Sequence, residues 1–398
     1  MVNIKNANAL RLHGSSYEDF INSADFAERT KIGYRYAIRK YMESLGYIND
    51  DDKDADNGNV DRLLNNGDSV KIQTQVKNFL SYMRNKKNLS PRSLHSLFTG
   101  LKSYFEYNDI DNINWKKIHK HNVGKMAKKV NDMPYTYDDL KRLLDFADER
   151  TKVVLMLMAT SGMRRGAVNI LKLRDLEWID EHKLFKITVY NGDLNSQYTT
   201  FITPEASKMV QTYLKFRERH GEILKPENPL VRDQFNSTWK KPGDTENIQK
   251  PQHLSVDSIN SILSRLLFNS GIRNAENVKV RRSGERHVHM ATHSCRKFFK
   301  SKMMATEPAI NPVIIEFLMG HIKSTGLEAV YYKPTEHDLL QNYIKAIPYL
   351  TINEENRQQL KIDVLTARDK RREQVFLKIL EEMRVSKELR EEFMKDTA

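Results

Sequence analysis

The sequence has almost no cysteine and no long apolar run. Cys295 is the single cysteine among 398 residues, which excludes an intramolecular disulfide framework and any zinc cluster that needs several cysteines. No stretch approaches eighteen apolar residues, and the first residues lack the apolar core of a signal peptide. We therefore expect a soluble cytoplasmic protein that makes no use of a membrane.

Clustered carboxylates beside a histidine are also missing. No Asp-x-Asp pair lies beside a histidine, although a nuclease that uses paired metal ions needs such ligands. Cys295 and His293 fall within one helical turn and have no acidic partner, which argues against a cysteine hydrolase. The sequence thus predicts chemistry without a metal or a cofactor.

Positive charge is in excess. The chain has 65 Lys and Arg against 52 Asp and Glu, a net charge of +13 and a pI near 9.4. A basic surface gains affinity for a polyanion because it displaces counterions from phosphates. Charge alone also fits a merely basic soluble protein. If the partner is double-stranded DNA, the cytoplasmic protein would be nucleoid-associated when bound.

The first 115 residues are expected to form an N-terminal helical domain. Apolar residues recur at helical spacing from Tyr34 to Leu45 and from Val76 to Met83. Asn49 to Asp68 is rich in Asp, Asn and Gly, and predicts an exposed connection or irregular insertion. Ser90 and Pro91 predict a helix start.

A basic run follows and is expected to link two domains, over residues 116–132. It has no acidic residue between Asp111 and Asp132. Such a segment could lie along a DNA backbone; the alternative is a solvated basic loop. The candidate DNA-binding residues are Lys116, Lys117, Lys120, Lys125, Lys128 and Lys129.

A second domain is expected over residues 133–351. Thr136 and Asp139 have the spacing of a capping box. Residues 184–189 and 198–202 are β-prone around an Asn191-Gly192-Asp193 turn, which predicts a small antiparallel sheet among helices. Residues 232–252 are polar, contain Pro242-Gly243, and predict a mobile loop.

The remaining residues, 352–398, are expected to form a charged helical tail. Its apolar points Phe376, Ile379, Leu380 and Met383 are spaced as one stripe of an amphipathic helix. That stripe could pack on the body of the protein or on another subunit.

Three segments of the second domain carry residue types suited to phosphodiester exchange. Arg164 lies just past Gly162, His293 and Arg296 are three apart on one helical face, and His321 follows Gly320. Tyr331 and Tyr332 come ten and eleven residues after His321. Guanidinium groups can hold the charge on phosphorus oxygens, imidazoles can assist proton movement, and a tyrosine hydroxyl beside such cations can attack phosphorus.

In this order the segments resemble the tyrosine recombinase (phage integrase) family. That family shows an arginine in a Gly-Leu/Met-Arg turn, a lysine on a β-hairpin, His-x-x-Arg, Gly-His and a tyrosine shortly afterwards. The pair Tyr331-Tyr332 before Lys333-Pro334 looks most like archaeal and archaeal-virus integrases. The resemblance implies a mainly α protein, with an N-terminal helical core-binding domain and a mixed α+β catalytic domain.

The same resemblance implies roles for individual residues. Arg164 and Arg296 would clamp the scissile phosphate, His293 would assist proton transfer and His321 would bind a phosphate oxygen. Tyr332 would be the nucleophile, with Tyr331 as the alternative, giving a 3′-phosphotyrosine bond without metal or ATP. The family works on DNA as a tetramer.

Three departures from the family pattern are visible. Ala167 stands where a glutamate is usual, and the tyrosines come one or two residues later than is common. Asn191 stands where the family places its general-acid lysine, so Lys186 or another lysine would have to substitute. Two alternative functions stay open: a DNA-binding protein with an impaired site, and a topoisomerase that uses the same phosphotyrosine chemistry.

Overall fold

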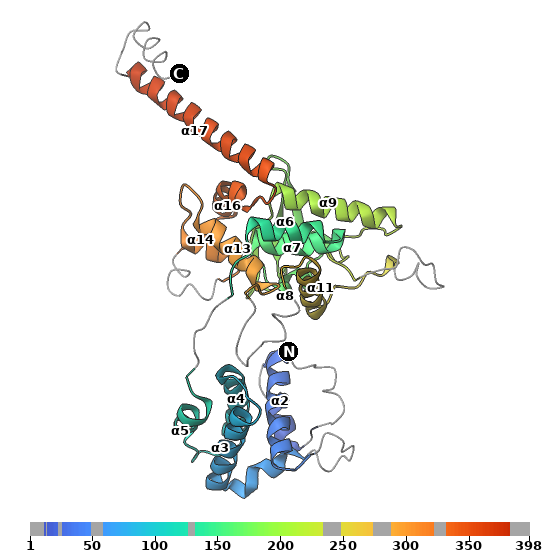
Figure 1. Cartoon of the computed structure of the whole chain (residues 1–398), viewed down its shortest axis with the longest axis vertical. Helices are drawn as coiled ribbons and strands as arrows, with labels where there is room; N and C mark the ends of the chain where they lie inside the picture. Colours follow the sequence, from blue (N-terminus) through green and yellow to red (C-terminus); the bar gives the residue numbers. More distant parts are fainter. Residues whose placement is uncertain are drawn as a thin grey trace. The chain divides into compact units, whose positions relative to one another are not determined.

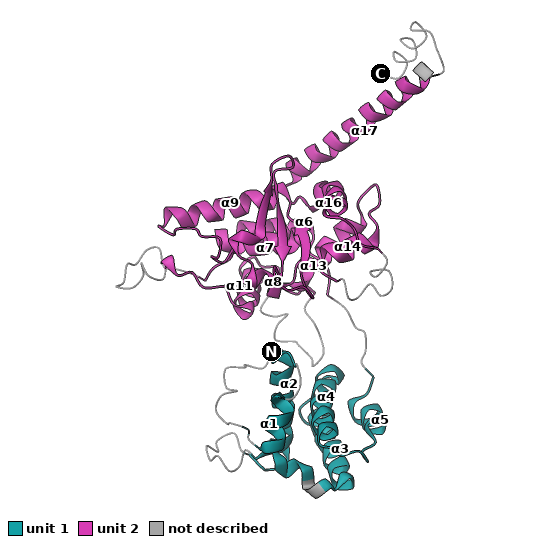
Figure 2. Cartoon of the chain, turned by 180° about the vertical axis from the view of Figure 1, so that it is seen from behind, with its two compact units in different colours: residues 1–130, 280–286 teal, residues 131–279, 287–398 magenta. Residues whose placement is uncertain are grey.

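The structure is a computed structural model, and it divides the chain into two compact units (Figure 2). The described residues up to 125 belong to the first unit and those from 132 belong to the second. Tyr331, Lys128 and Lys129 lie outside the described residues. The residues that the structure describes are 12, 14–22, 26–48, 59–125, 132–233, 248–273, 288–321 and 332–382.

The first unit is helical and has its own apolar core. Helices α2 and α4 pack closely along each other because Gly100 meets Ala37: a Cβ added to Gly100 would lie 2.7 Å from the Ala37 Cβ. Ser90 caps α4 as expected, since its side chain accepts a hydrogen bond from the Ser93 amide at 3.3 Å. The elements are α1 (Ser15–Asn22), α2 (Glu28–Ser44), η3 (Val60–Gly67), α3 (Ser69–Asn85), α4 (Pro91–Tyr107), α5 (Trp115–Ile118) and η4 (His119–Val123).

Two segments of this unit are more ordered than the sequence indicated. Val60 and Leu63 of η3 are fully buried, so the described end of the Asn49 to Asp68 segment is part of the core. In the basic run, Ile118 and Val123 are also fully buried. Residues 116–123 are therefore helical and packed on the first unit, whereas a basic linker or a solvated basic loop was expected there. Apolar residues spaced among the lysines were the overlooked signal.

The second unit consists of helices around a small sheet (Figure 1). Helix α7 is central, because nearly all of its side chains are buried and it packs against both α9 and α13. The helices are α6 (Tyr137–Asp145), α7 (Glu149–Ser161), α8 (Arg165–Ile170), η5 (Leu173–Asp175), α9 (Pro204–Arg219), α11 (Val256–Asn269), α13 (His293–Met304), α14 (Pro312–Leu318), α16 (Glu336–Leu350) and α17 (Glu354–Glu382). A mainly helical fold with one small sheet is thus confirmed.

The sheet is antiparallel, with strand order β1-β2-β3. The predicted pair is present as β2 (Leu184–Val189) and β3 (Tyr198–Phe201), with Val189 opposite Tyr198. Strand β1 (Leu176–Ile179) was not predicted, because it is a four-residue edge strand whose side chains are at most partly buried. The expected capping box at Thr136 and Asp139 starts α6.

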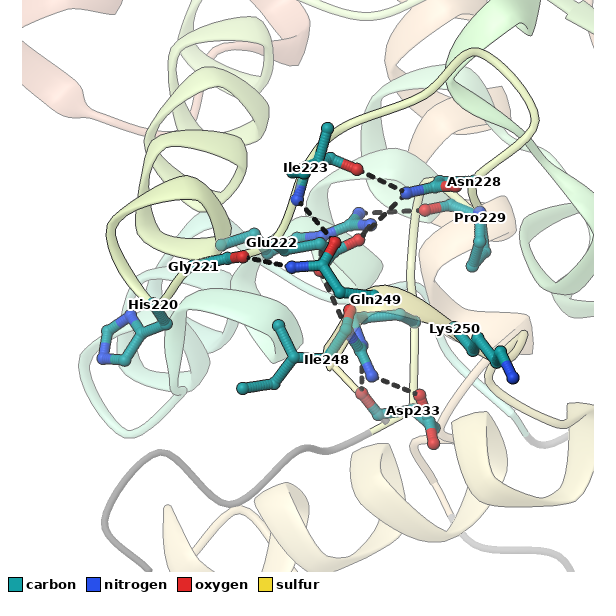
Figure 3. A network of polar contacts seen from close by, with 12 residues as sticks. His220, Gly221, Glu222, Ile223, Asn228, Pro229, Asp233, Ile248, Gln249 and Lys250 are labelled. Carbon is teal, nitrogen blue, oxygen red and sulfur yellow. Dashed lines mark hydrogen bonds and ion pairs between the residues drawn. The ribbon is translucent and has the colours of Figure 1, made fainter. Parts of the chain in front are cut away.

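A buried charge network fixes the chain after α9 (Figure 3). The Glu222 carboxylate accepts hydrogen bonds from Arg217 Nε at 2.9 Å and Arg232 Nη1 at 3.0 Å, and none of the three side chains is exposed. Burial alone would raise the pKa of Glu222, but the two guanidinium groups hold it below its usual value. Arg232 Nη1 also donates to the Ile248 carbonyl at 2.9 Å.

The same network corrects the prediction of a mobile loop at residues 232–252, as far as its two described ends are concerned. Besides the Arg232 contact with Ile248, the Asp233 amide donates to the Gln252 carbonyl at 2.8 Å. Residues 234–247, between the two ends, lie outside the described residues. Among the helices that the structure describes, none combines the length and apolar character needed to cross a membrane.

Candidate active site

The turn between α7 and α8 presents Arg164. Gly162 ends α7 in the left-handed conformation with φ +66°, and Arg164 is the exposed residue that precedes the first turn of α8. A Cβ added to Gly162 would lie 2.4 Å from Phe299 Cδ1 on α13. Only glycine therefore satisfies both the backbone angle and the close approach of α13 to this turn.

Helix α13 supplies His293 and Arg296 from the same face. His293 is exposed at the first position of the helix, and Arg296 is 7% exposed one turn later. Arg296 Nη1 donates to the carbonyl oxygen of Gly162, and Arg296 Nη2 makes a 2.6 Å hydrogen bond to His321 Nε2. The guanidinium group is thus fixed by two contacts, one through each terminal nitrogen.

His321 is positioned by the end of α14. The His321 amide donates to the Glu316 carbonyl at 2.9 Å and the Gly320 amide donates to the Phe317 carbonyl at 3.0 Å, which is the Schellman pattern. Gly320 has φ +67°, as the expected tight turn requires. The chain therefore turns back, and the imidazole reaches the Glu316 side chain, with 2.6 Å between His321 Nδ1 and Glu316 Oε2.

These contacts define the tautomer of His321. A guanidinium group can only donate, so Nε2 accepts from Arg296 and the ring hydrogen is on Nδ1, pointing at Glu316. Burial lowers the pKa of His321, and Arg296 and Arg164 lower it further, while Glu316 raises it. In the neutral form His321 holds Arg296, and it can donate to a phosphate oxygen only after Nε2 gains a proton.

Two residues of this site were not found in the sequence. Glu316 accepts from His321 and also from Lys300 Nζ at 2.5 Å. Burial would raise the pKa of Glu316, but Lys300 and His321 keep it below its usual value. Lys300 is one helical turn after Arg296 on α13, whereas Glu316 is five residues before His321, which lies beyond the end of α14. Neither residue belongs to a sequence motif, so no local pattern marked them.

The two arginines act on each other. Burial lowers the pKa of Arg296 to about 10, and the positive charge of Arg164 is the next cause of that shift. The two positive charges repel each other in the partly buried site. An anion that contacts both would relieve the repulsion, so the arrangement is suited to a phosphodiester.

Tyrosines of the sheet line the same region. A Cβ on Gly320 would lie 2.4 Å from the Tyr198 ring, which places β3 directly against the His321 turn. Burial raises the pKa of Tyr198, while Arg296 and Arg164 act in the opposite direction. Tyr190 makes a ring contact with Tyr198, at a centroid distance of 6.2 Å. Neither tyrosine was singled out from the sequence.

Asn191 and Lys186 are the two hairpin residues considered for the general-acid position, and they have different partners. Asn191 Nδ2 donates to Asp175 Oδ1 at 3.0 Å. Lys186 pairs with Glu177 at 2.6 Å and with Glu336 at 3.0 Å, and although burial lowers its pKa, these carboxylates raise it above its usual value. An ammonium group with a raised pKa gives up its proton less readily, so Lys186 is a poor substitute for a general-acid lysine.

The structure brings Arg164, Arg296 and His321 together, with His293 one turn from Arg296. Tyr332 is 39% exposed and precedes α16, whose capping residue is Thr335. Within the described part of the chain, no hydrogen bond or ring contact joins Tyr332 to the arginines. The choice between Tyr332 and Tyr331 thus stays a prediction.

Comparison with known proteins identifies the family of the chain. A model of the phage integrase family matches residues 135–337, which are just over half of the 398 residues. The chain belongs to the phage integrase family. Tyrosine recombinase XerA from Pyrococcus horikoshii is 29% identical over 147 residues, or 37% of this chain and 48% of that protein. This chain therefore spans about half the length of that curated relative. The match to an archaeal recombinase agrees with the archaeal resemblance of the sequence.

Solved structures of recombinases are also similar to the chain. A crystal structure of XerA recombinase is 15% identical, covers 83% of this chain and 96% of its own, and has a TM-score of 0.35. A λ integrase(75-356) dimer bound to a COC′ core site is 14% identical, covers 81% and 98% respectively, and has a TM-score of 0.49.

Proposed function

We propose that this phage integrase family member is a site-specific recombinase that cleaves and rejoins DNA through a 3′-phosphotyrosine intermediate. One observation carries the proposal: the Arg296 guanidinium is fixed between the Gly162 carbonyl and His321 Nε2, close enough to Arg164 for the two charges to interact. A pair of positioned cations stabilises the charge that develops on the phosphorus oxygens during in-line attack.

The proposed reaction conserves the phosphodiester energy. The Tyr332 oxygen attacks phosphorus and loses its proton, with His293 assisting the transfer. The bond from phosphorus to the 5′ oxygen breaks, and that oxygen leaves as a 5′-hydroxyl after it takes up a proton. A 5′-hydroxyl of another strand then reverses the same steps, so neither ATP nor a metal ion takes part.

Binding would involve double-stranded DNA, phosphate contacts from both units, and self-association into a tetramer on two duplexes. Lys116, Lys117, Lys120 and Lys125 are exposed and available for such contacts. The protein would then act in the cytoplasm and associate with the nucleoid when bound. Integration, excision and resolution of chromosome dimers all use this chemistry.

The test is covalent trapping. The full-length protein is incubated with a library of nicked DNA, and strands left attached to protein are sequenced. A nick that releases the 5′-hydroxyl fragment prevents religation and accumulates the intermediate. Tyr332→Phe should abolish attachment and Tyr331→Phe should retain it. If the Tyr332→Phe protein still forms the complex, Tyr331 is the nucleophile. If the DNA is attached through neither tyrosine, the proposal is wrong.

Asn191 favours a second candidate, a protein that binds DNA without cleaving it. Its amide is bonded to Asp175 and cannot replace an ammonium group as a proton donor. Binding with no covalent product on any member of the library would support this candidate. Relaxation of supercoiled plasmid without a specific site would indicate a topoisomerase.

A further inference from the structure

Helix α17 extends beyond the body of the second unit (Figures 1 and 2). Its first turns are held, because the Arg357 guanidinium lies 3.9 Å from the Tyr137 ring centroid, Leu360 packs on the core and Lys361 lies 5.2 Å from the Tyr349 ring centroid. Every residue from Ile362 to Phe376 is exposed. The distal part of the helix thus presents all its faces, apolar side chains included.

Exposed apolar residues gather at two places on this distal part. The first group is Ile362, Val364 and Leu365, and the second is Val375, Phe376 and Ile379. Their exposed fractions lie between 42% and 56%. Between the groups, the six consecutive residues from Arg368 to Glu373 are all charged. Two apolar patches therefore flank a charged centre.

One face of the helix connects the patches. Residues 362, 365, 369, 372, 376 and 379 follow the alternating spacing of three and four that places side chains on one seam of a coiled coil. The seam reads Ile, Leu, Asp, Arg, Phe, Ile. A seam of this kind is buried by a second helix with a matching pattern.

When the seam is aligned with a reversed copy of itself, apolar residues face apolar residues and each acidic residue faces a basic one. We propose that α17 pairs with α17 of a second copy of this chain in antiparallel orientation. Ile362 then faces Ile379 of the second copy, Leu365 faces Phe376, and Asp369 faces Arg372. The interface has two-fold symmetry, so each contact forms twice, including the Asp–Arg pair at its centre.

Charge selects the orientation. A parallel pair in register would oppose Asp369 to Asp369 and Arg372 to Arg372, which costs free energy in a partly desolvated seam. Within one helix Arg372 Nη1 already lies 3.9 Å from Asp369 Oδ1. Antiparallel pairing adds an opposite charge of the second copy against each of them, whereas parallel pairing adds a like charge. The seam from 362 to 379 is about 27 Å long, at roughly 1.5 Å per residue. A face this short gives a concentration-dependent dimer, and it forms without DNA and without the proposed recombination chemistry.

Directed cross-linking tests the orientation. Ile362→Cys and Ile379→Cys are made separately in the full chain, and both positions are exposed, so the body keeps its fold. The native Cys295 does not interfere, because it is fully buried and burial raises its pKa to about 12. On mild oxidation, each variant alone should stay uncross-linked and an equal mixture should give a disulfide dimer. Cross-linking of each variant with itself would mean parallel pairing and would overturn the proposal.

Charge reversal tests the centre of the seam. Asp369→Arg should weaken dimerisation in analytical ultracentrifugation by about tenfold or more, since it opposes two arginines. Asp369→Arg combined with Arg372→Asp should restore it. The matched control is Asp363→Arg, an exposed charge off the seam, which should leave the dimer unchanged. If the charge variants instead change DNA affinity and the mixture of the two cysteine variants gives no cross-link, α17 binds DNA and the proposal is wrong.

Discussion

Arg296 Nη2 lies 2.6 Å from His321 Nε2, and this contact joins two segments that are 25 residues apart in the chain. The same guanidinium also binds the carbonyl of Gly162, two residues before Arg164. One side chain thus sets the positions of the α7 turn and the α14 turn relative to α13. The geometry of the proposed phosphate site depends on it more than on any exposed residue of the motif.

The first prediction concerns Arg296→Lys. A lysine keeps the positive charge, but one ammonium group cannot hold the Gly162 carbonyl and His321 with the two separate nitrogens of a guanidinium. We expect covalent DNA attachment to slow by about 10²-fold or more, as for the loss of one positioned donor. Arg174→Lys is the control, since Arg174 forms a surface ion pair with Glu227 and should tolerate the change. Equal rates for the two variants would contradict the role of Arg296.

The second prediction concerns Glu316→Gln and pH. The His321 pKa is below its usual value of 6.5, and Glu316 is the group that raises it. Glutamine still accepts the Nδ1 hydrogen but carries no charge, so the His321 pKa should fall further. Protonation of Nε2 breaks its bond from Arg296, and we expect this loss to outweigh the phosphate contact that protonated His321 could make. Activity should therefore decrease as pH falls through this pKa, and in Glu316→Gln the decrease should occur at lower pH.

The check is the pH profile of covalent attachment, with the His321 tautomer and titration followed by nitrogen-15 NMR. Glu227→Gln serves as the control, because Glu227 pairs with Lys172 and Arg174 and is not among the groups that shift the His321 pKa. Because the folded pKa is below the unfolded value, acidification below 6.5 also destabilises the native state until pH passes the folded pKa. A profile of Glu316→Gln that moves to higher pH would refute the assignment.

Much of this site follows from local sequence, and the remainder depends on tertiary contacts. The Gly162 turn, the shared face of His293 and Arg296, and the Gly320 turn are local patterns, and the structure shows each of them. Glu316 and Lys300 belong to no such motif. Their role depends on a tertiary contact, because Lys300 of α13 reaches the Glu316 carboxylate only when α13 and α14 pack together. The Glu222 network was likewise hidden, since its arginines come from separate segments.

The third prediction concerns the basic segment. Lys116, Lys117 and Lys120 are exposed on helices that belong to the first unit. If each contacts a phosphate, replacing all three by alanine should lower the slope of log K against log salt by roughly 2.7, at about 0.9 per contact. The measurement is fluorescence anisotropy over a salt series, with Lys183→Ala as control because Lys183 pairs with Asp180 on the hairpin. An unchanged slope would mean that this segment does not contact DNA phosphates.

The last prediction separates backbone strain from close packing at Gly162. Gly162→Ala must place a side chain at φ +66° and 2.4 Å from Phe299, whereas Gly192→Ala has φ +92° and nothing within 4 Å. Left-handed strain costs about 1–2 kcal/mol at either position, and overpacking adds about 1–3 kcal/mol at Gly162 alone. Denaturant unfolding should therefore show the larger loss of stability for Gly162→Ala.

The same substitution should also affect cleavage. Because Phe299 and Arg296 share α13, the displaced helix should withdraw Arg296 from the Gly162 carbonyl. Cleavage should therefore fall in Gly162→Ala and persist in Gly192→Ala. Equal stability losses would show that α13 yields without strain, and the close approach would then not be what positions Arg296.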